Sequence, residues 1–398
     1  MPKVSNRLSR LSESATLAMA QMSRELQAKG VDVISLSLGE PDFDTPEFIK
    51  EAAQKAIKDN FSHYTPVPGL PEVRSAIATK FKRDNSLEFN LDQIVISTGA
   101  KQSLANVCLC LLNAGDEVLL PCPYWVSYAE IIKLAEGIPV EVPSDISTDF
   151  KVTPEELEAA ITPKTKMLIF SSPCNPSGTV YTQSELEDIS KMLERHPNIY
   201  VMSDEIYEHI NFTDKHFSIG AISSMKNRTI TVNGVSKGFA MTGWRVGFIG
   251  APTWIAKACS KIQGQVTSAT CAIAQKAAEK AVLAEPKSTT KDMKGTFLRR
   301  RNMLIELLKD IPGVRCNVPK GAFYVFPEIS SYFGKSEGNT TINNANDLCM
   351  YLLNNAHVAC VAGDAFGSPE CMRISYAASD AKLTKAMHRI KIFLAKLS

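Results

Sequence analysis

The sequence has almost no excess of charge of one sign. Among 398 residues, 44 Lys and Arg stand against 42 Asp and Glu, which leaves a formal net charge of +2. A chain with so small a net charge creates no long-range field that gathers polyanions. We therefore do not expect a nucleic acid as partner. Apolar residues make up 44% of the chain, which is enough for two domains with a substantial shared interior.

Long apolar runs are also missing. The longest candidate, residues 107–112, is far shorter than the roughly 20 residues that span a bilayer as a helix. In residues 1–26 the apolar positions are interleaved with Ser, Glu and Gln, so no unbroken apolar core precedes a small-residue cleavage site. The sequence predicts a soluble, cytoplasmic protein without a membrane span or a secretion signal.

Neither a disulfide framework nor a metal motif is recognisable. The chain has ten cysteines, but it is not a small, loop-rich scaffold of the disulfide-bonded kind. Cys108 and Cys110 are two residues apart, and no second Cys or His pair follows at the spacing of a zinc site. We expect most cysteines to be reduced and buried, and we predict no metal ion. Those in apolar or helical patterns are Cys108, Cys110, Cys259, Cys271 and Cys349.

What the sequence does contain is an alternation of short apolar runs with helical patterns between about residues 90 and 250. This alternation is typical of an α/β domain with a largely parallel sheet, and the continuous apolar character of the runs indicates cover on both faces. Ligands of such sheets bind beyond the carboxyl ends of the strands. The expected strands are residues 94–97, 117–121, 167–172, 199–204, 229–234 and 246–250.

The pattern changes beyond residue 286 to that of a smaller α+β unit. It predicts a charged helix at residues 291–308, a strand at 321–326 and an amphipathic helix at 381–397. The polar residues 334–346 resemble a loop or insertion, because they offer nothing to bury. The domains that we expect are a large one at residues 48–288 and a small one formed by residues 1–47 and 289–398.

A glycine turn follows the first expected strand and leads into an expected helix, at Gly99, Ala100 and Lys101. A glycine turn that leads into a helix leaves backbone N–H groups unpaired and aimed at one point, which suits a phosphate or carboxylate. An ordinary strand-to-helix turn explains the same residues, so this motif alone decides nothing. The spacing of a P-loop is absent.

Further polar residues follow the later strands. Asp204 ends one strand and Tyr207 comes three residues later, while Ser236, Lys237 and Arg245 follow the next one. Taken singly, each has an ordinary explanation as a helix cap, a solvated surface residue or a salt-bridge partner. Together they match pyridoxal phosphate. A lysine can form a Schiff base, an aspartate can keep the pyridine nitrogen protonated, a phenol can bond the 3-oxygen, and Ser, Arg and helix N–H groups can hold the phosphate.

These motifs carry a family resemblance. From SLGEPDFDTP near the N-terminus to MRISYA near the C-terminus, with PCNPSG, SDEIYEHI and SKGFAMTGWRVG in order between them, the chain resembles the class I aminotransferases of the aspartate aminotransferase family. The resemblance implies the fold type I architecture of pyridoxal-phosphate-dependent transferases. That fold is α/β, with a large domain around a mostly parallel central sheet and a smaller α+β domain.

The resemblance also implies roles around the cofactor. Lys237 is similar to the lysine that forms the internal aldimine and then moves the proton between Cα and C4′, and Asp204 to the partner of the pyridinium. Tyr207 and Asn175 resemble the pair that bonds the 3-oxygen, and Trp125 the ring stacked on the cofactor. Residues similar to the phosphate site are Ser236, Arg245 and the backbone of Gly99, Ala100 and Lys101.

For the substrate, Arg373 resembles the arginine that holds the α-carboxylate, beside the backbone of Gly39, with Trp125 and Asn175 also in contact. A structural salt bridge is the ordinary alternative for Arg373. Tyr64 resembles a tyrosine that reaches the phosphate of the neighbouring subunit, which implies a homodimer with shared active sites.

Lys101 belongs to a GAKQ motif that resembles a subgroup whose lysine contacts the distal carboxylate of aspartate or glutamate. The predicted reaction is therefore ping-pong transfer of the amino group from aspartate to 2-oxoglutarate. Prephenate, aromatic, alanine or kynurenine aminotransferase activity on the same fold stays open. A non-catalytic amino-acid sensor of a transcription regulator is disfavoured, because we expect no helix-turn-helix unit ahead of the fold.

Overall fold

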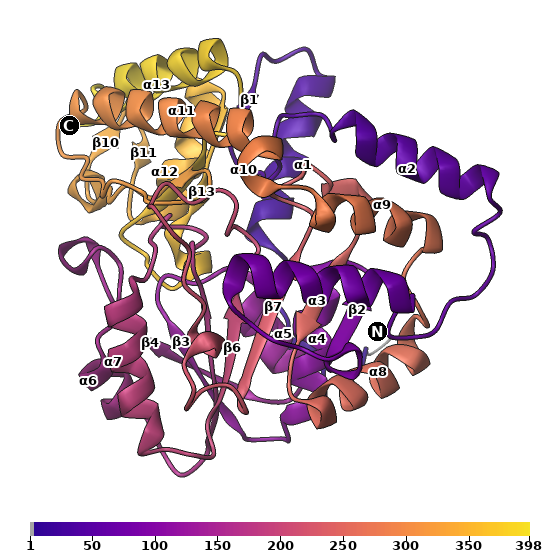
Figure 1. The fold of residues 1–398 in the computed structure, drawn as a ribbon. Coiled ribbons are helices and arrows are strands. Elements are labelled where there is room, and N and C mark those ends of the chain that lie inside the picture. The colour runs from indigo at the N-terminus through magenta and orange to yellow at the C-terminus, as the bar shows by residue number, and fades with distance from the viewer. Residues whose placement is uncertain (1–3) are drawn as a thin grey trace.

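The computed structural model describes residues 4–398, so residues 1–3 of the expected small domain lie outside the described residues. A seven-stranded sheet is the centre of the larger part of the molecule (Figure 1). Its strands are β2 (Ile94–Ser97), β3 (Glu117–Pro121), β4 (Ile138–Val142), β5 (Thr165–Ser171), β6 (Tyr200–Asp204), β7 (Thr229–Gly234) and β8 (Gly247–Gly250).

The strand order is β2-β8-β7-β6-β5-β3-β4. All neighbours pair in parallel except β8, which is antiparallel to both β2 and β7. The segment between β7 and β8 contains only a short 3₁₀ turn, whereas a parallel return needs a long crossover, usually a helix. The mostly parallel sheet expected from the sequence is therefore confirmed. Strand β4 was not among the expected ones, because this edge strand contains Pro139 and is partly exposed.

Helices cover both faces of this sheet, as its continuous apolar strands indicate. Val118 and Leu120 face one layer, formed by α4, α5 and α8. Leu119, between them in the chain, faces the other way and packs with α6 and α7, while α2, α3 and α9 complete that second layer. The helices are α1 (Ala15–Ala28), α2 (Glu47–Lys58), α3 (Pro71–Asn85), α4 (Ala100–Leu111), α5 (Ser127–Leu134), α6 (Pro154–Ala159), α7 (Gln183–Glu194), α8 (Thr253–Val266), α9 (Ala272–Leu283), α10 (Pro286–Thr289), α11 (Lys291–Lys309), α12 (Ala345–Tyr351) and α13 (Asp380–Leu394).

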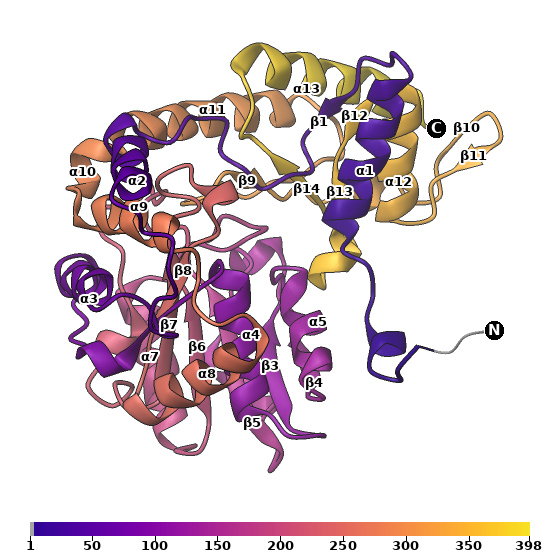
Figure 2. The same ribbon diagram turned by 90° about the vertical axis from the view of Figure 1, so that its right-hand side faces the viewer.

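Helix α1 and the C-terminal third of the chain come together in the smaller part, at the top of Figure 2. A three-stranded antiparallel sheet has the order β13-β14-β9, and β1 pairs in parallel with β12. One apolar cluster joins α1 to α11, α12 and α13. These strands are β1 (Ile34–Ser35), β9 (Tyr324–Val325), β12 (Val358–Ala359), β13 (Val361–Ala362) and β14 (Met372–Ser375).

Three expectations for the C-terminal third are wrong in part. Of the strand expected at residues 321–326, only Tyr324–Val325 forms a strand. Ala322 has a positive φ of 56°, which breaks the extended backbone before it. The final helix begins at Asp380 and ends at Leu394, not at residues 381–397.

The third correction concerns residues 334–346, which were expected to have nothing to bury. They contain a hairpin of β10 (Ser336–Glu337) and β11 (Thr340–Thr341). Ile342 and Ala345 are fully buried at the edge of the small-part core. Two isolated apolar side chains are therefore enough to anchor an otherwise polar segment.

Among residues 4–398, no helix is long and apolar enough to cross a membrane. All ten cysteines are free and most are buried, as expected, although Cys271 is exposed.

Candidate active site

A cavity of about 240 Å³ lies at the carboxyl ends of β5, β6 and β7, between the large sheet and the smaller part of the molecule. The N-terminus of α4 and residues of β9 and β14 complete its wall. All the site residues expected from the sequence line it except Gly99, which lies just behind Arg245, and Tyr64. Those that line it are Gly39, Ala100, Lys101, Trp125, Asn175, Asp204, Tyr207, Ser236, Lys237, Arg245 and Arg373.

Lys237 follows β7 and extends into the cavity, where its Nζ donates a hydrogen bond of 2.5 Å to the backbone oxygen of Gly39. Burial lowers the pKa of Lys237 to about 8, and the neighbouring Arg373 acts in the same direction. A lysine attacks a carbonyl only as the neutral amine, and a lowered pKa increases the neutral fraction near neutral pH. Lys237 is thus suited to forming a Schiff base.

Asp204 is the last residue of β6 and is 4% exposed. The hydroxyl of Tyr128 donates to its Oδ2 at 2.7 Å, and the backbone N–H of Ile206 donates to Oδ1 at 3.2 Å. Burial raises the pKa of Asp204 to about 6. No cation forms an ion pair with it among the described residues, so a protonated pyridine nitrogen would supply the missing positive charge.

Arg373, on β14, is 1% exposed. Its guanidinium donates to Asn175 Oδ1 at 2.9 Å and to the backbone oxygen of Ser37. The rings of Tyr324 and Phe366 lie 4.6 and 5.0 Å from its central carbon. Its Nε is buried without a hydrogen-bond partner, and no carboxylate pairs with it in the described part of the chain. A flat guanidinium held in this way suits the carboxylate of a ligand.

Tyr207 and Tyr324 share a hydrogen bond of 2.8 Å between their hydroxyls. Burial raises the pKa of both phenols, which keeps them protonated and able to donate. A Cβ at Gly39 would overlap the Tyr324 hydroxyl, so a side chain at this position would displace Tyr324. The hydroxyl pair therefore connects the Lys237 side of the cavity to Arg373.

The N-terminus of α4 meets Arg245 at the opposite end of the cavity. Gly99, the N-cap of α4, has a φ of 85°, and a Cβ on it would overlap the guanidinium of Arg245. Glycine thus allows Arg245 to lie against the free N–H groups of the helix. With Ser236 also lining the cavity, this end offers the donors that a phosphate requires.

Lys101 lies over the ring of Trp125, with Nζ 4.9 Å from the ring centroid. Partial burial lowers the pKa of Lys101, and the charge of Arg245 adds to the effect. The side chain is exposed enough to move, and it makes no ion pair with a described residue. Lys101 therefore remains available to a second carboxylate.

The charges around the cavity are unbalanced. Lys101, Lys237, Arg245 and Arg373 all line it, and none forms an ion pair within residues 4–398. Asp204 is the carboxylate in the lining. Arg373 is buried and Lys237 is partly buried, and an unpaired cation in such a position is costly unless an anion joins it, whereas Lys101 and Arg245 are exposed. The residues present thus fit a ligand with a phosphate and a carboxylate, as pyridoxal phosphate with an amino acid would be.

The sequence did not indicate Tyr128 and Tyr324 as site residues. Tyr128 is three residues after Trp125, and Tyr324 lies within the GAFYVF run, but neither position carries a local signal for its hydrogen-bond partner. Residues of the N-terminal segment, Ser14, Thr16 and Leu17, also line the cavity without any expectation from the sequence. Tyr64 is 98% exposed and lies outside the cavity of its own chain, so its role toward a second subunit stays a prediction.

Comparison with known proteins yields one family. The model of the family "Aminotransferase class I and II" matches residues 31–390. The chain is 46% identical to the aspartate/prephenate aminotransferase of Cereibacter sphaeroides over the full length of both. Among solved structures, the aspartate aminotransferase of Rhizobium meliloti superposes with a TM-score of 0.96 at 41% identity over 100% of both chains. That of Thermus thermophilus with maleate gives 0.91 at 38% identity, over 99% of this chain and 100% of the other.

Proposed function

The chain belongs to the class I and II aminotransferase family, whose members are pyridoxal-phosphate-dependent enzymes, and from this premise we propose its substrates and its assembly. The proposed reaction transfers the amino group of aspartate to 2-oxoglutarate. Two cations at the cavity carry the proposal. Arg373 is placed for the α-carboxylate common to all amino acids, and Lys101 provides a second charge for a side-chain carboxylate.

The residues of the site have separate roles in the proposed reaction. When bound, pyridoxal phosphate supplies an electron-withdrawing ring that stabilises negative charge at the substrate Cα. Lys237 would hold the cofactor and, once released, would take the proton from the substrate Cα as general base and deliver it to C4′ as general acid. Asp204 would keep the ring nitrogen of the bound cofactor protonated, and the hydrogen bond from Tyr128 holds Asp204 in place. Amino donor and acceptor use the same cations in turn, so the kinetics should be ping-pong.

Prephenate is a second candidate for the amino acceptor. The Cereibacter relative is named as an aspartate/prephenate aminotransferase. Prephenate carries a second carboxylate, which Lys101 could meet in the same position as the side chain of aspartate. Aromatic, alanine and kynurenine aminotransferase activities lack such support, because their amino-acid substrates have no second carboxylate for Lys101 to bind.

We further propose a homodimer in the cytoplasm, in which Tyr64, exposed in its own chain, completes the phosphate site of the partner subunit. The cavity lies between the large sheet and the smaller part, in which α1 packs with α11, α12 and α13. On this basis we propose residues 48–288 as the large domain and residues 1–47 with 289–398 as the small one.

Initial rates of the cofactor-loaded protein test the substrate class. With 2-oxoglutarate as acceptor, aspartate should give a kcat/KM at least about tenfold above alanine and phenylalanine, because only aspartate uses both cations. Comparable efficiency on alanine or phenylalanine would contradict the proposal. Replacing 2-oxoglutarate by prephenate measures the second candidate in the same assay. Arg373→Lys is the control, since its loss should fall equally on all amino acids.

A further inference from the structure

The turn after β6 has two faces, only one of which belongs to the active site. Asp204 and Tyr207 point into the cavity. Glu205 and Glu208 lie behind them, 1% and 7% exposed, and face the C-terminal end of α3. Nothing in the amino-transfer chemistry described above uses these two carboxylates. Ionised carboxylates this deeply buried need compensation, so their partners are informative.

Glu205 accepts four hydrogen bonds. Its Oε2 receives them from Asn85 Nδ2 at 2.8 Å, His216 Nε2 at 2.8 Å and Ser218 Oγ at 2.6 Å. Its Oε1 receives one from Ser203 Oγ at 3.0 Å. Burial lowers the pKa of His216, but the charge and hydrogen bond of Glu205 outweigh it and leave that pKa raised. The donors come from β6, from α3 and from the segment after the turn, so one carboxylate ties three parts of the chain together.

Glu208 is bound by two residues of the same helix, α3. Lys80 of α3 forms an ion pair with it, and Asn85 Nδ2 donates to its Oε2 at 2.7 Å. Although burial alone raises the pKa of Glu208, the ammonium of Lys80 and the neighbouring histidines bring it down to about 2. Asn85 Oδ1 in turn accepts from Lys80 at 2.6 Å. The side chain of Asn85 therefore bridges both glutamates and the lysine.

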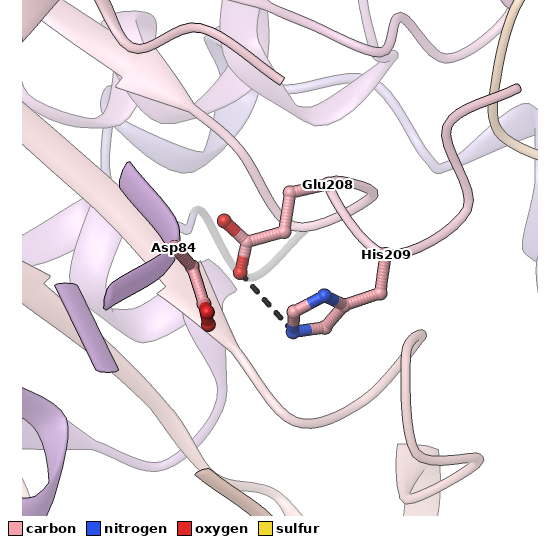
Figure 3. A group of neighbouring side chains, drawn as sticks. All are labelled: Asp84, Glu208 and His209. Carbon is pink, nitrogen blue, oxygen red and sulfur yellow. Dashed lines mark ion pairs between the residues drawn. The ribbon is translucent and has the colours of Figure 1, made fainter. Parts of the chain in front are cut away.

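The neighbouring group of Asp84, Glu208 and His209, drawn in Figure 3, has the spacing of a metal site, with ligand atoms within 4.8 Å of one another. His209 Nε2 lies 3.3 Å from Glu208 Oε1. However, the ammonium of Lys80 contacts Glu208 and lies 3.7 Å from Asp84. The chain itself thus supplies the cation that these carboxylates require, and a metal ion would have to displace it.

We propose that Glu205 is a positioning residue, which holds Asp204 and Tyr207 at the cofactor through its hydrogen bonds with Asn85, His216 and Ser218. Asp204 and Glu205 are adjacent, and the backbone N–H of Glu205 bonds to Val232 of β7, the strand that leads to Lys237. A shift of Glu205 would therefore move Asp204 relative to Lys237. Displacements of about 1 Å are enough to cost roughly a hundredfold in rate.

The inference rests on the proposed function in that Asp204 faces the cofactor, and two variants of the loaded enzyme test it. Glu205→Leu removes the acceptor. Glu205→Gln keeps the shape, because its amide oxygen can accept from the three Oε2 donors and its amide nitrogen can face Ser203. The negative charge of Glu205 contributes to raising the pKa of Asp204 above its ordinary value, so the Gln variant leaves Asp204 ionised over a wider pH range and does not impair it.

Two measurements separate positioning from stability. The absorbance of the bound cofactor is titrated with pH, and kcat and KM are measured with aspartate. Glu205→Leu should move the absorbance midpoint by about one pH unit or more and lower kcat at least about tenfold with little change in KM. Glu205→Gln should stay near the parent in both. Glu185→Leu, which removes a distant ion pair with Lys151, is the control for loss of a partly buried carboxylate.

Parental absorbance and kcat in a folded Glu205→Leu protein would overturn the proposal, and so would equal losses in the Leu and Gln variants, which would assign the effect to charge. If the Leu variant does not fold, Ser218→Ala removes a single donor. A cofactor absorbance and kcat identical to the parent in that variant would likewise overturn the proposal. The absorbance reports on the cofactor alone. Failure of aspartate as a substrate would therefore refute the proposed function without changing the absorbance result.

Discussion

Tyr128 donates a hydrogen bond of 2.7 Å to Asp204 Oδ2, and both side chains are buried. This bond stabilises the ionised form of Asp204 and opposes the effect of burial, which raises its pKa to about 6. The hydroxyl of a helix residue thus helps to set the charge of a carboxylate on β6. Because the proposed chemistry needs Asp204 ionised, the consequence is measurable.

Tyr128→Phe removes that bond and keeps the ring. A hydrogen bond to a charged group contributes about 1.5–3 kcal/mol, or roughly one to two pH units. The ionised form loses stabilisation, so the pKa of Asp204 rises and the acid limb of the kcat profile should move to higher pH by about that amount. Asp204→Ala is the reference variant, which should remain folded but lose activity at every pH. An unchanged acid limb in Tyr128→Phe would contradict the prediction.

Lys237 should set the pH dependence of cofactor loading. Its pKa is lowered to about 8 by burial in the cofactor-free chain, and only the neutral amine reacts with the aldehyde of pyridoxal phosphate. The rate at which the apoenzyme takes up cofactor should therefore rise with pH through about 8 and level off above it. A midpoint near the ordinary value of 10.5 would contradict this environment for Lys237.

Lys237→Ala provides the matching control. It should abolish amino transfer, while the protein still binds cofactor noncovalently through the phosphate and ring contacts. Equilibrium dialysis measures the binding, and the absorbance of the dialysed protein shows whether a covalent link remains. Near-parental turnover in Lys237→Ala would show that another residue performs the chemistry.

Much of this site follows from the sequence, because strand ends can be located from apolar runs. Asp204, Lys237 and Arg245 each follow such a run, and parallel strands bring their carboxyl ends to one edge. Arg373 could be assigned only through its family motif, since no local pattern places β14 beside the large sheet. Tyr128, Tyr324 and Glu205 depend on partners far away in the chain, and a single sequence does not contain that pairing.

Gly99→Ala tests the phosphate end of the cavity. The φ of 85° at this position strains any residue with a Cβ, and the added methyl would overlap Arg245. Arg245 must move away from the N-terminus of α4, so the affinity for pyridoxal phosphate should fall at least about tenfold. Gly115→Ala is the matched control, because Gly115 has a similar φ of 88° with open space around its Cβ. Equal affinity losses in both variants would indicate general strain instead.

The proposed homodimer predicts complementation between two subunits that are each defective on their own. Tyr64→Ala should weaken cofactor binding in the partner's site while its own Lys237 remains intact. Mixing it with Lys237→Ala subunits should restore up to about a quarter of the parental activity, since one site in a mixed dimer, formed in half of the pairs, has both residues. Full parental activity in a monomer at assay concentration would refute shared sites.

Lys101 decides between a dicarboxylate-selective enzyme and a broad one. Its ammonium lies over Trp125 and has no carboxylate partner among the described residues, whereas a plain surface lysine at a helix N-terminus is disfavoured by the dipole by about 0.3–1 kcal/mol. Lys101→Ser removes the charge but keeps a small polar group. Efficiency on aspartate should fall by about tenfold or more, which corresponds to about 1.4 kcal/mol, while efficiency on phenylalanine should hold. Inhibition by maleate, a dicarboxylate without an amino group, should weaken in parallel. An equal loss on aspartate and phenylalanine would show that Lys101 serves the cofactor or the fold, because such a loss does not depend on the second carboxylate of the substrate.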